Sequence, residues 1–396
     1  MYVALTKNLP MPNPAKLALY RKSPEYGPKI LFFSGGSALR EVSQHLIQYT
    51  HNSIHIVTPF DSGGSSAVLR KAFQMPAVGD IRNRLMALAD QSLQGYPEVY
   101  RLFAHRLPKT DDRKYLQATM EALVAGDHPL IACIAHPMRK IIRHHLAVFY
   151  QNKPEDFDLR GASIGNLVLA GGYLSYNRHL DPVIFIYSKL VQVRGTVRPV
   201  VNSPFHLAAT LKNGQVVLGQ HRITGKEGGP LPAKIAALSL SRSMERFEPV
   251  TVSVRDKLIS LIQEADIICF PMGSFFSSIL VNLLPHGVGS AVCRNPCPKV
   301  FIPNMGIDPE LGETTILEQI QWIHRLLNDD LPVMSSPIPL IDLVILDRNR
   351  ADGPTPFEIE ELKRRGIRLL AVDLVDANDS LRIDPQKLIT VLLSLC

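Results

Sequence analysis

Glycines and small polar residues recur in this chain directly after short apolar runs, and they are the residues best suited to bind a ligand. Residues 34–37 read Ser-Gly-Gly-Ser, and residues 61–66 read Asp-Ser-Gly-Gly-Ser-Ser. Glycine lets the backbone approach a ligand, and the N–H groups that begin the next helix carry partial positive charge. Such loops can hold phosphate. Alternatively, the first loop is a tight turn without a ligand, and the second is an Asx-turn followed by a helix cap.

Charged and amide side chains next to these glycines could add specificity. Asp61 follows an apolar run, where a carboxylate could hold a metal, orient a hydroxyl or bond neighbouring amides. Asp80 is typical of a helix N-cap, and Arg82 and Asn83 would then lie in the first turn, within reach of a phosphate or a base. The alternative for Arg82 and Arg84 is a solvated position on the surface.

The spacing of the glycines excludes two common nucleotide sites. The loops lack the three spaced glycines of the dinucleotide fingerprint with its downstream acid, and they lack the lysine of a P-loop. An ordinary nicotinamide dehydrogenase is therefore disfavoured. We expect no nicotinamide or flavin cofactor.

The elements that would position these loops alternate between strand and helix. Apolar runs predict strands at 29–33, 53–58, 266–270, 299–302, 340–346 and 367–372. Helical patterns follow several of them, including one that runs from the loop at 271–274 through Leu284. This order predicts an α/β fold with a Rossmann-like, mostly parallel sheet flanked by helices. The glycine loops would then meet at the carboxyl edge of the sheet.

Two segments depart from this alternation. Residues 96–150 are helical and rich in Arg, Lys and His, which predicts a helical insertion. Residues 191–225 alternate as a strand does and contain Asn213-Gly214, a strong hairpin signal, so a small antiparallel β excursion is expected. We therefore predict a core domain over 1–310 and a C-terminal α/β extension over 311–396 packed on the same sheet.

Composition sets broader limits. Hydrophobic residues make up 46% of the 396 residues, and 43 Lys and Arg against 36 Asp and Glu give a formal charge of +7, which suits anionic ligands. Five irregularly spaced cysteines do not predict a disulfide framework. Without a readable secretory signal, long apolar segment or basic run interleaved with aromatics, we expect a cytoplasmic protein that binds neither membrane nor nucleic acid.

Four segments together resemble the CofD-like family. They are residues 61–66, residues 79–85, Ser163-Ile164-Gly165-Asn166-Leu167, and residues 272–279, and they occur in the family's order. The family includes transferases that attach a phospholactyl or phosphoenolpyruvyl group to a deazaflavin, and a bacterial branch, the gluconeogenesis factors, which this chain resembles more closely. Relatives commonly place two aspartates where this chain has Asp61-Ser62.

The resemblance implies a ligand site assembled from matching positions. The implied ligand-binding residues are Gly35, Gly36, Ser37, Gly63, Gly64, Ser65, Ser66, Asp80, Arg82, Asn83, Gly165, Asn166, Gly273, Ser274, Ser277 and Asn304. Asp61 is the implied catalytic residue and the candidate ligand of a Mg²⁺ ion. The expected partner is a phosphorylated, nucleotide-like small molecule, and the family makes a homodimer plausible.

Two functions follow from this resemblance. In the first, the protein is a transferase that moves a phospholactyl- or phosphoenolpyruvyl-type group from a nucleoside diphosphate donor to an alcohol acceptor, with magnesium offsetting charge. In the second, it is a non-catalytic regulatory protein that binds a nucleotide or nucleotide sugar. The missing second aspartate favours the second function. The sequence leaves open whether the protein is an enzyme.

Overall fold

A seven-stranded parallel sheet forms the centre of the protein. The computed structural model describes residues 8–92, 95–225, 229–331, 340–350, 353–377, 379 and 381–396. The strands lie in the order β11 (Arg368–Val372), β10 (Leu343–Asp347), β9 (Lys299–Phe301), β8 (Ile267–Phe270), β1 (Ile30–Ser34), β2 (Ile54–Val57) and β3 (Thr196–Pro199). All neighbouring pairs are parallel. The predicted fold class is confirmed.

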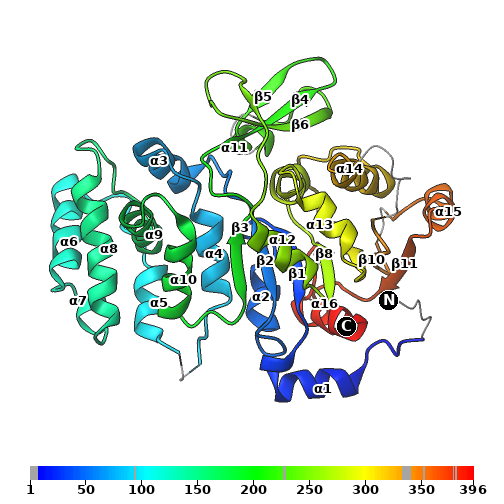
Figure 1. Cartoon of the computed structure of the whole chain (residues 1–396), viewed down its shortest axis with the longest axis horizontal. Coiled ribbons are helices and arrows are strands. Elements are labelled where there is room, and N and C mark those ends of the chain that lie inside the picture. The colour runs from blue at the N-terminus through cyan, green and yellow to red at the C-terminus, as the bar shows by residue number, and fades with distance from the viewer. Residues whose placement is uncertain are drawn as a thin grey trace.

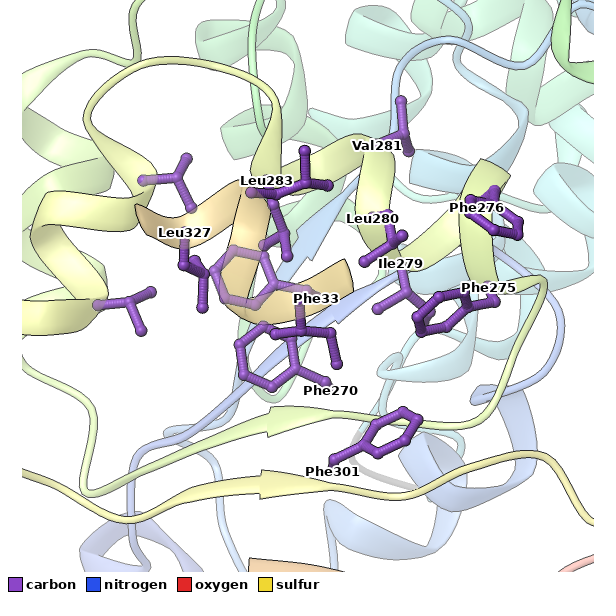
Figure 2. Packing of buried hydrophobic residues seen from close by; sticks show 14 of the residues in the cluster. Phe33, Phe270, Phe275, Phe276, Ile279, Leu280, Val281, Leu283, Phe301 and Leu327 are labelled. Atoms are coloured by element: carbon purple, nitrogen blue, oxygen red, sulfur yellow. The ribbon is translucent and has the colours of Figure 1, made fainter. Parts of the chain in front are cut away.

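Both faces of the sheet are buried, since every residue of β1, β2 and β8 is buried. In β1, Leu31 and Phe33 pack on one face, whereas Ile30 and Phe32 pack on the other. Figure 2 shows Phe33 beside Phe270, whose rings stack with centroids 5.5 Å apart beneath the segment 275–283. The loops that follow these strands therefore begin from a closely packed part of the sheet.

Helices cover both faces and extend the molecule beyond the sheet edge (Figure 1). One face packs against α2 (Arg40–Leu46) and α16 (Pro385–Leu395), with α1 (Pro14–Lys22) and the 3₁₀ turn η1 (Pro24–Tyr26) nearby along the chain. The other face packs against α12 (Asp256–Gln263), α13 (Val288–Arg294) and α14 (Ile316–Asn328). Helix α15 (Pro356–Arg364) connects β10 to β11.

A helical cluster with its own apolar core lies beyond β3. It contains α3 (Gly64–Phe73), α4 (Gly79–Ala87), α5 (Pro97–Ala104), α6 (Arg113–Ala125), α7 (Pro129–Ala132), α8 (Met138–Asn152), α9 (Ile164–Ser175) and α10 (Leu180–Leu190). Helices α5 to α8 correspond to the segment expected to be a helical insertion. Within the described residues, no helix combines the length and apolar content that a membrane crossing requires.

The antiparallel excursion is a four-stranded sheet that projects from the body in Figure 1. Its order is β5 (Val216–Leu218), β4 (His206–Leu211), β6 (Ile235–Ser241) and β7 (Pro249–Val250), and α11 (Gln220–Ile223) follows β5. The predicted hairpin turn is present, with Gly214 at φ +85°. The excursion extends beyond residue 225, however, and Thr196–Pro199 joins the parallel sheet instead, paired with β2.

Two local predictions at helix starts differ from the structure. Helix α4 begins at Gly79 with Val78 as its N-cap, so Asp80 lies in the first turn and is not the cap. The helix expected through Leu284 is a π-helix over Phe275–Ile279 (η2) followed by a 3₁₀ helix over Leu280–Leu283 (η3). Carboxylates from a later loop accept hydrogen bonds from the first amides of η2. Neither this long-range pairing nor the position of the α4 cap is visible in the local sequence.

Candidate functional site

The loop after β1 is packed too closely against α4 and η2 to carry side chains. A Cβ added to Gly36 would lie 2.3 Å from Asp80 Oδ1, and one on Gly35 would lie 2.7 Å from Ser278 Oγ. Only glycine permits this approach. The first two predicted loop residues are thus brought against the third predicted segment.

A buried arginine holds the loop after β2 in place. Arg70 Nη1 donates to the carbonyls of Phe60 and Asp61, each at 3.0 Å, and Nη2 donates to the carbonyl of Phe205 at 2.6 Å. Burial lowers the pKa of Arg70 to about 10, so the guanidinium remains charged at neutral pH. Asp61 Oδ1 accepts the Gly63 N–H at 3.0 Å, which holds the turn in place.

The first turns of α3, α4 and α9 meet at one point. Asn166 Nδ2 donates to Ser65 Oγ at 3.3 Å, which joins α9 to α3. A Cβ on Gly79 would lie 2.6 Å from Ser66 Oγ, which joins α4 to α3. None of the three helices has a side-chain bond from its N-cap residue. Three helix starts without a side-chain bond from their N-cap residues therefore lie close together, which suits an anion.

Buried polar atoms at this junction lack partners. Arg82 is 8% exposed, donates to Asn83 Oδ1 at 2.7 Å and to the Phe103 carbonyl at 3.4 Å, and lies beside the Tyr187 hydroxyl. Asn166 Oδ1 and Ser163 Oγ are buried and unpartnered within the described chain. A Cβ on Gly165 would lie 2.6 Å from the Tyr187 hydroxyl and 2.7 Å from the Phe103 carbonyl, so this glycine lets the start of α9 pack against α5 and α10. Unsatisfied buried groups are costly, and a polar ligand would satisfy them.

A cavity of about 420 Å³ continues from the β1 loop toward β8 and β9. Among its lining residues are the predicted Ser37, Gly273, Ser274 and Asn304. The Asn304 side chain fixes the far wall, because its Oδ1 accepts the Gly273 N–H and its Nδ2 donates to the Gly273 carbonyl, both at 2.7 Å. The structure thus gathers these four predicted residues in one cavity.

Ser277 takes a different position from the one implied. Glu310 Oε2 accepts the N–H groups of Phe276 and Ser277 at 2.8 and 2.9 Å, and Ser277 Oγ also donates to the Glu310 carboxylate. Asp308 Oδ2 accepts the Phe275 N–H at 2.8 Å. Burial, and next the charge of Asp308, raise the pKa of Glu310 to about 7. The amides that begin η2 are therefore held by the protein's own carboxyl groups.

These loops lie in the part of the chain that the family comparison covers. The chain matches the family described as 2-phospho-L-lactate transferase CofD over residues 30–375. The chain belongs to the CofD family. The match continues well beyond residue 310, so it includes much of the C-terminal segment that carries β10, α15 and β11.

Relatives within the CofD family cover nearly the whole chain. The chain is 30% identical to a Bacillus subtilis protein named gluconeogenesis factor, over 93% of this chain and 98% of the relative. It is 28% identical to a putative gluconeogenesis factor of Thermoanaerobacterium thermosulfurigenes, over 93% and 97%. A crystal structure of a UPF0052 family protein from Bacillus halodurans shares the fold, with a TM-score of 0.66 and 24% identity over 92% and 99% of the two chains.

Several residues near the predicted site loops were missed by sequence reasoning. Arg40 and Arg382 line the 420 Å³ cavity, and Arg382 is paired with Glu41 at 2.7 Å. Arg40 follows a glycine loop in the first turn of its helix, which is a usable signal. Arg382 lies far along the chain in no recognised motif, and His221, which contacts Ser62, lies in the β excursion.

The carboxylates of the site offer a metal few protein ligands. Across the described residues, no group of three or more His, Cys, Asp or Glu side chains could hold a metal ion. Asp61 Oδ2 faces α4, since a Cβ on Gly79 would lie 3.7 Å from it. One carboxylate suits Mg²⁺ only when the phosphates of a ligand supply further oxygen ligands.

Proposed function

We propose that the protein is a regulatory binding protein for a nucleotide or nucleotide sugar, and that it binds this ligand without turnover. The diphosphate would lie where α3, α4 and α9 begin, and the remainder would extend into the 420 Å³ cavity. Three neighbouring helix starts without side-chain caps, with the charged Arg82 in the first turn of α4, are the observation that carries this proposal. Anionic oxygens are the groups that satisfy such donors.

Arg82 would bind the ligand and the neighbouring amides would orient it. Its guanidinium is buried, and burial lowers its pKa, but an arginine still keeps its charge at neutral pH. Asn166 would add an amide, and Asn304 would keep the cavity wall in place through its two bonds to Gly273. The relatives are named gluconeogenesis factors, which names no transfer reaction, whereas the family description names a transferase.

A transferase is the second candidate, and Asp61 supports it. Its carboxylate lies between the β2 loop and the start of α4, beside the proposed diphosphate position. In the transferase, an alcohol oxygen would attack the phosphorus of the phospholactyl- or phosphoenolpyruvyl-type group, and a nucleoside monophosphate would leave. A magnesium ion bound by Asp61 and the phosphates would offset negative charge there.

Thermal unfolding of the purified protein tests the binding proposal. Uridine diphosphate sugars and guanosine diphosphate would be added with and without magnesium. A ligand at a hundredfold its Kd stabilises the folded state by about 2.7 kcal/mol, which raises the melting temperature measurably. We expect Arg82→Gln to lose this stabilisation and the exposed Arg364→Gln variant to retain it. A shift that survives in Arg82→Gln would contradict the proposed site.

Phosphorus NMR separates the two functions. The stabilising ligand would be incubated with magnesium and a panel of alcohols, and the spectra followed for a nucleoside monophosphate. We expect the ligand to remain intact. Release of the monophosphate, abolished by Asp61→Asn, would instead establish the transferase.

A further inference from the structure

A second cavity of about 360 Å³ lies between the small antiparallel sheet and α14. One wall comes from residues 234–236 at the start of β6 and from Lys212 after β4, and the other comes from α14 and the loop before it. None of the residues predicted for the first site lines this cavity. Its volume is within the range of small-molecule sites.

The floor of the cavity is aromatic. The rings of Phe276 and Trp322 meet edge to face, with centroids 5.3 Å apart and an interplanar angle of 89°. Phe276 itself is buried, whereas Trp322 is partly exposed. The Arg325 guanidinium lies over one face of the Trp322 ring, 5.2 Å from its centroid, so that face attracts positive charge. A planar, apolar molecule could pack against this surface.

Positive charge gathers at the rim of the same cavity. Lys212, Lys234 and Arg325 line it, and all three are exposed. Arg325 Nη1 donates to the Ala236 carbonyl at 3.2 Å, which fixes the guanidinium between the sheet and the helix. The remaining N–H groups of the guanidinium can donate hydrogen bonds to an anion.

Two carboxylates also line the walls, and both accept backbone N–H groups and form no ion pair with the rim cations among the described residues. Glu318 Oε2 accepts the Thr315 N–H at 2.9 Å as part of a capping box. Glu310 is directed to the amides of Phe276 and Ser277. The cavity therefore combines an aromatic floor with three cations that form no ion pair with Glu310 or Glu318 among the described residues.

We propose that this cavity binds a small organic anion, whose planar apolar body lies against Trp322 and whose carboxylate or phosphate meets Lys212, Lys234 and Arg325. The ligand would be an aromatic acid or an aryl phosphate. The site is separate from the proposed nucleotide site, because Phe276 of η2 lines this cavity whereas Gly273 and Ser274, just before η2, line the other.

The fluorescence of Trp322 tests this proposal directly, because it is the sole tryptophan of the chain. Phenyl phosphate, benzoate and neutral benzyl alcohol would each be titrated into the full-length protein. We expect a saturable change with phenyl phosphate or benzoate and none with benzyl alcohol. The tighter of the two anions identifies the preferred acidic group. No saturable change with either anion, or equal binding of the alcohol, would overturn the proposal.

Substitutions place the binding site. The double variant Lys234→Gln with Arg325→Gln should raise the Kd by about tenfold or more, because charge-assisted bonds to the anion are lost. Lys257→Gln, in the exposed first turn of α12, serves as the matched control and should leave the Kd unchanged. Arg82→Gln, which alters only the nucleotide site, should also leave it unchanged. An unaltered Kd in the double variant, or a loss of binding in Arg82→Gln, would assign the anion to another place.

Discussion

His221 Nδ1 lies 2.8 Å from Ser62 Oγ, and the same hydroxyl accepts the His221 backbone N–H at 3.3 Å. Ser62 belongs to the loop that follows β2, whereas His221 belongs to α11 in the antiparallel excursion. A hydroxyl that accepts one N–H can still donate its own proton to a neutral imidazole nitrogen. The pair therefore joins the glycine loop of the proposed nucleotide site to a part of the chain 159 residues away.

Ser62→Ala should weaken ligand binding without unfolding the protein. A hydrogen bond of this kind contributes about 0.5–1.5 kcal/mol, so we expect the Kd of the stabilising nucleotide to rise about two- to tenfold. Isothermal titration calorimetry measures the change. Ser260→Ala on the exposed face of α12 removes a comparable hydroxyl and should have no effect. An unchanged Kd in Ser62→Ala would show that the Ser62–His221 pair only holds the end of the small antiparallel sheet in place and does not affect ligand binding.

Arg84→Met should strongly destabilise the fold. Arg84 is 0% exposed and donates to the carbonyls of Leu39 and Gly35, each at 2.9 Å, and to Ser34 Oγ at 3.3 Å. Removing it leaves buried acceptors unpaired, and breaking a buried charged network costs about 3–5 kcal/mol in the free energy of unfolding. Urea denaturation measures this loss. The exposed Arg101→Met variant should stay within about 0.5 kcal/mol of the wild type.

Sequence reasoning located the glycine loops because their signals are local. A strand, a glycine turn and a helix occupy consecutive residues, so the periodicity changes at the loop itself, and residues 34–37 and 61–66 lie where that change predicts. Arg84 shows why other features were missed. Its acceptors come from residues 34–43, far from it in the sequence, so a solvated position was an equally good interpretation.

The C-terminal half of the site depends on similar long-range pairing. Ser277 was assigned to the ligand because it follows a strand and a glycine, which is a local pattern. The structure instead directs it to Glu310, 33 residues later, and no local pattern marks that glutamate. Strand Thr196–Pro199 illustrates the same limit, since its alternation indicates a strand but not which sheet it joins.

Gly36→Ala should disrupt the proposed nucleotide site. The new Cβ would lie 2.3 Å from Asp80 Oδ1 and 2.9 Å from Asp80 Cα, so rotation of the side chain alone cannot relieve the clash. The β1 loop must move away from α4, and we expect ligand stabilisation in thermal unfolding to be lost. Gly353→Ala is the control, because its Cβ would lie 3.6 Å from the Arg350 carbonyl in ordinary contact. Retained stabilisation in Gly36→Ala would show that this loop does not position the ligand.

Glu310→Gln should change how stability depends on pH. The folded-state pKa of Glu310 is raised to about 7 from an ordinary value of 4.5. A group with a raised pKa favours the folded state fully below the unfolded pKa, and this contribution is lost as pH rises through the folded pKa. The wild type should therefore lose up to about 3 kcal/mol relative to Glu310→Gln between pH 4.5 and 7.5. Urea denaturation at intervals across that range measures the difference. The exposed Glu313→Gln variant should follow the wild-type curve, and parallel curves for Glu310→Gln and the wild type would show that Glu310 is ionised throughout.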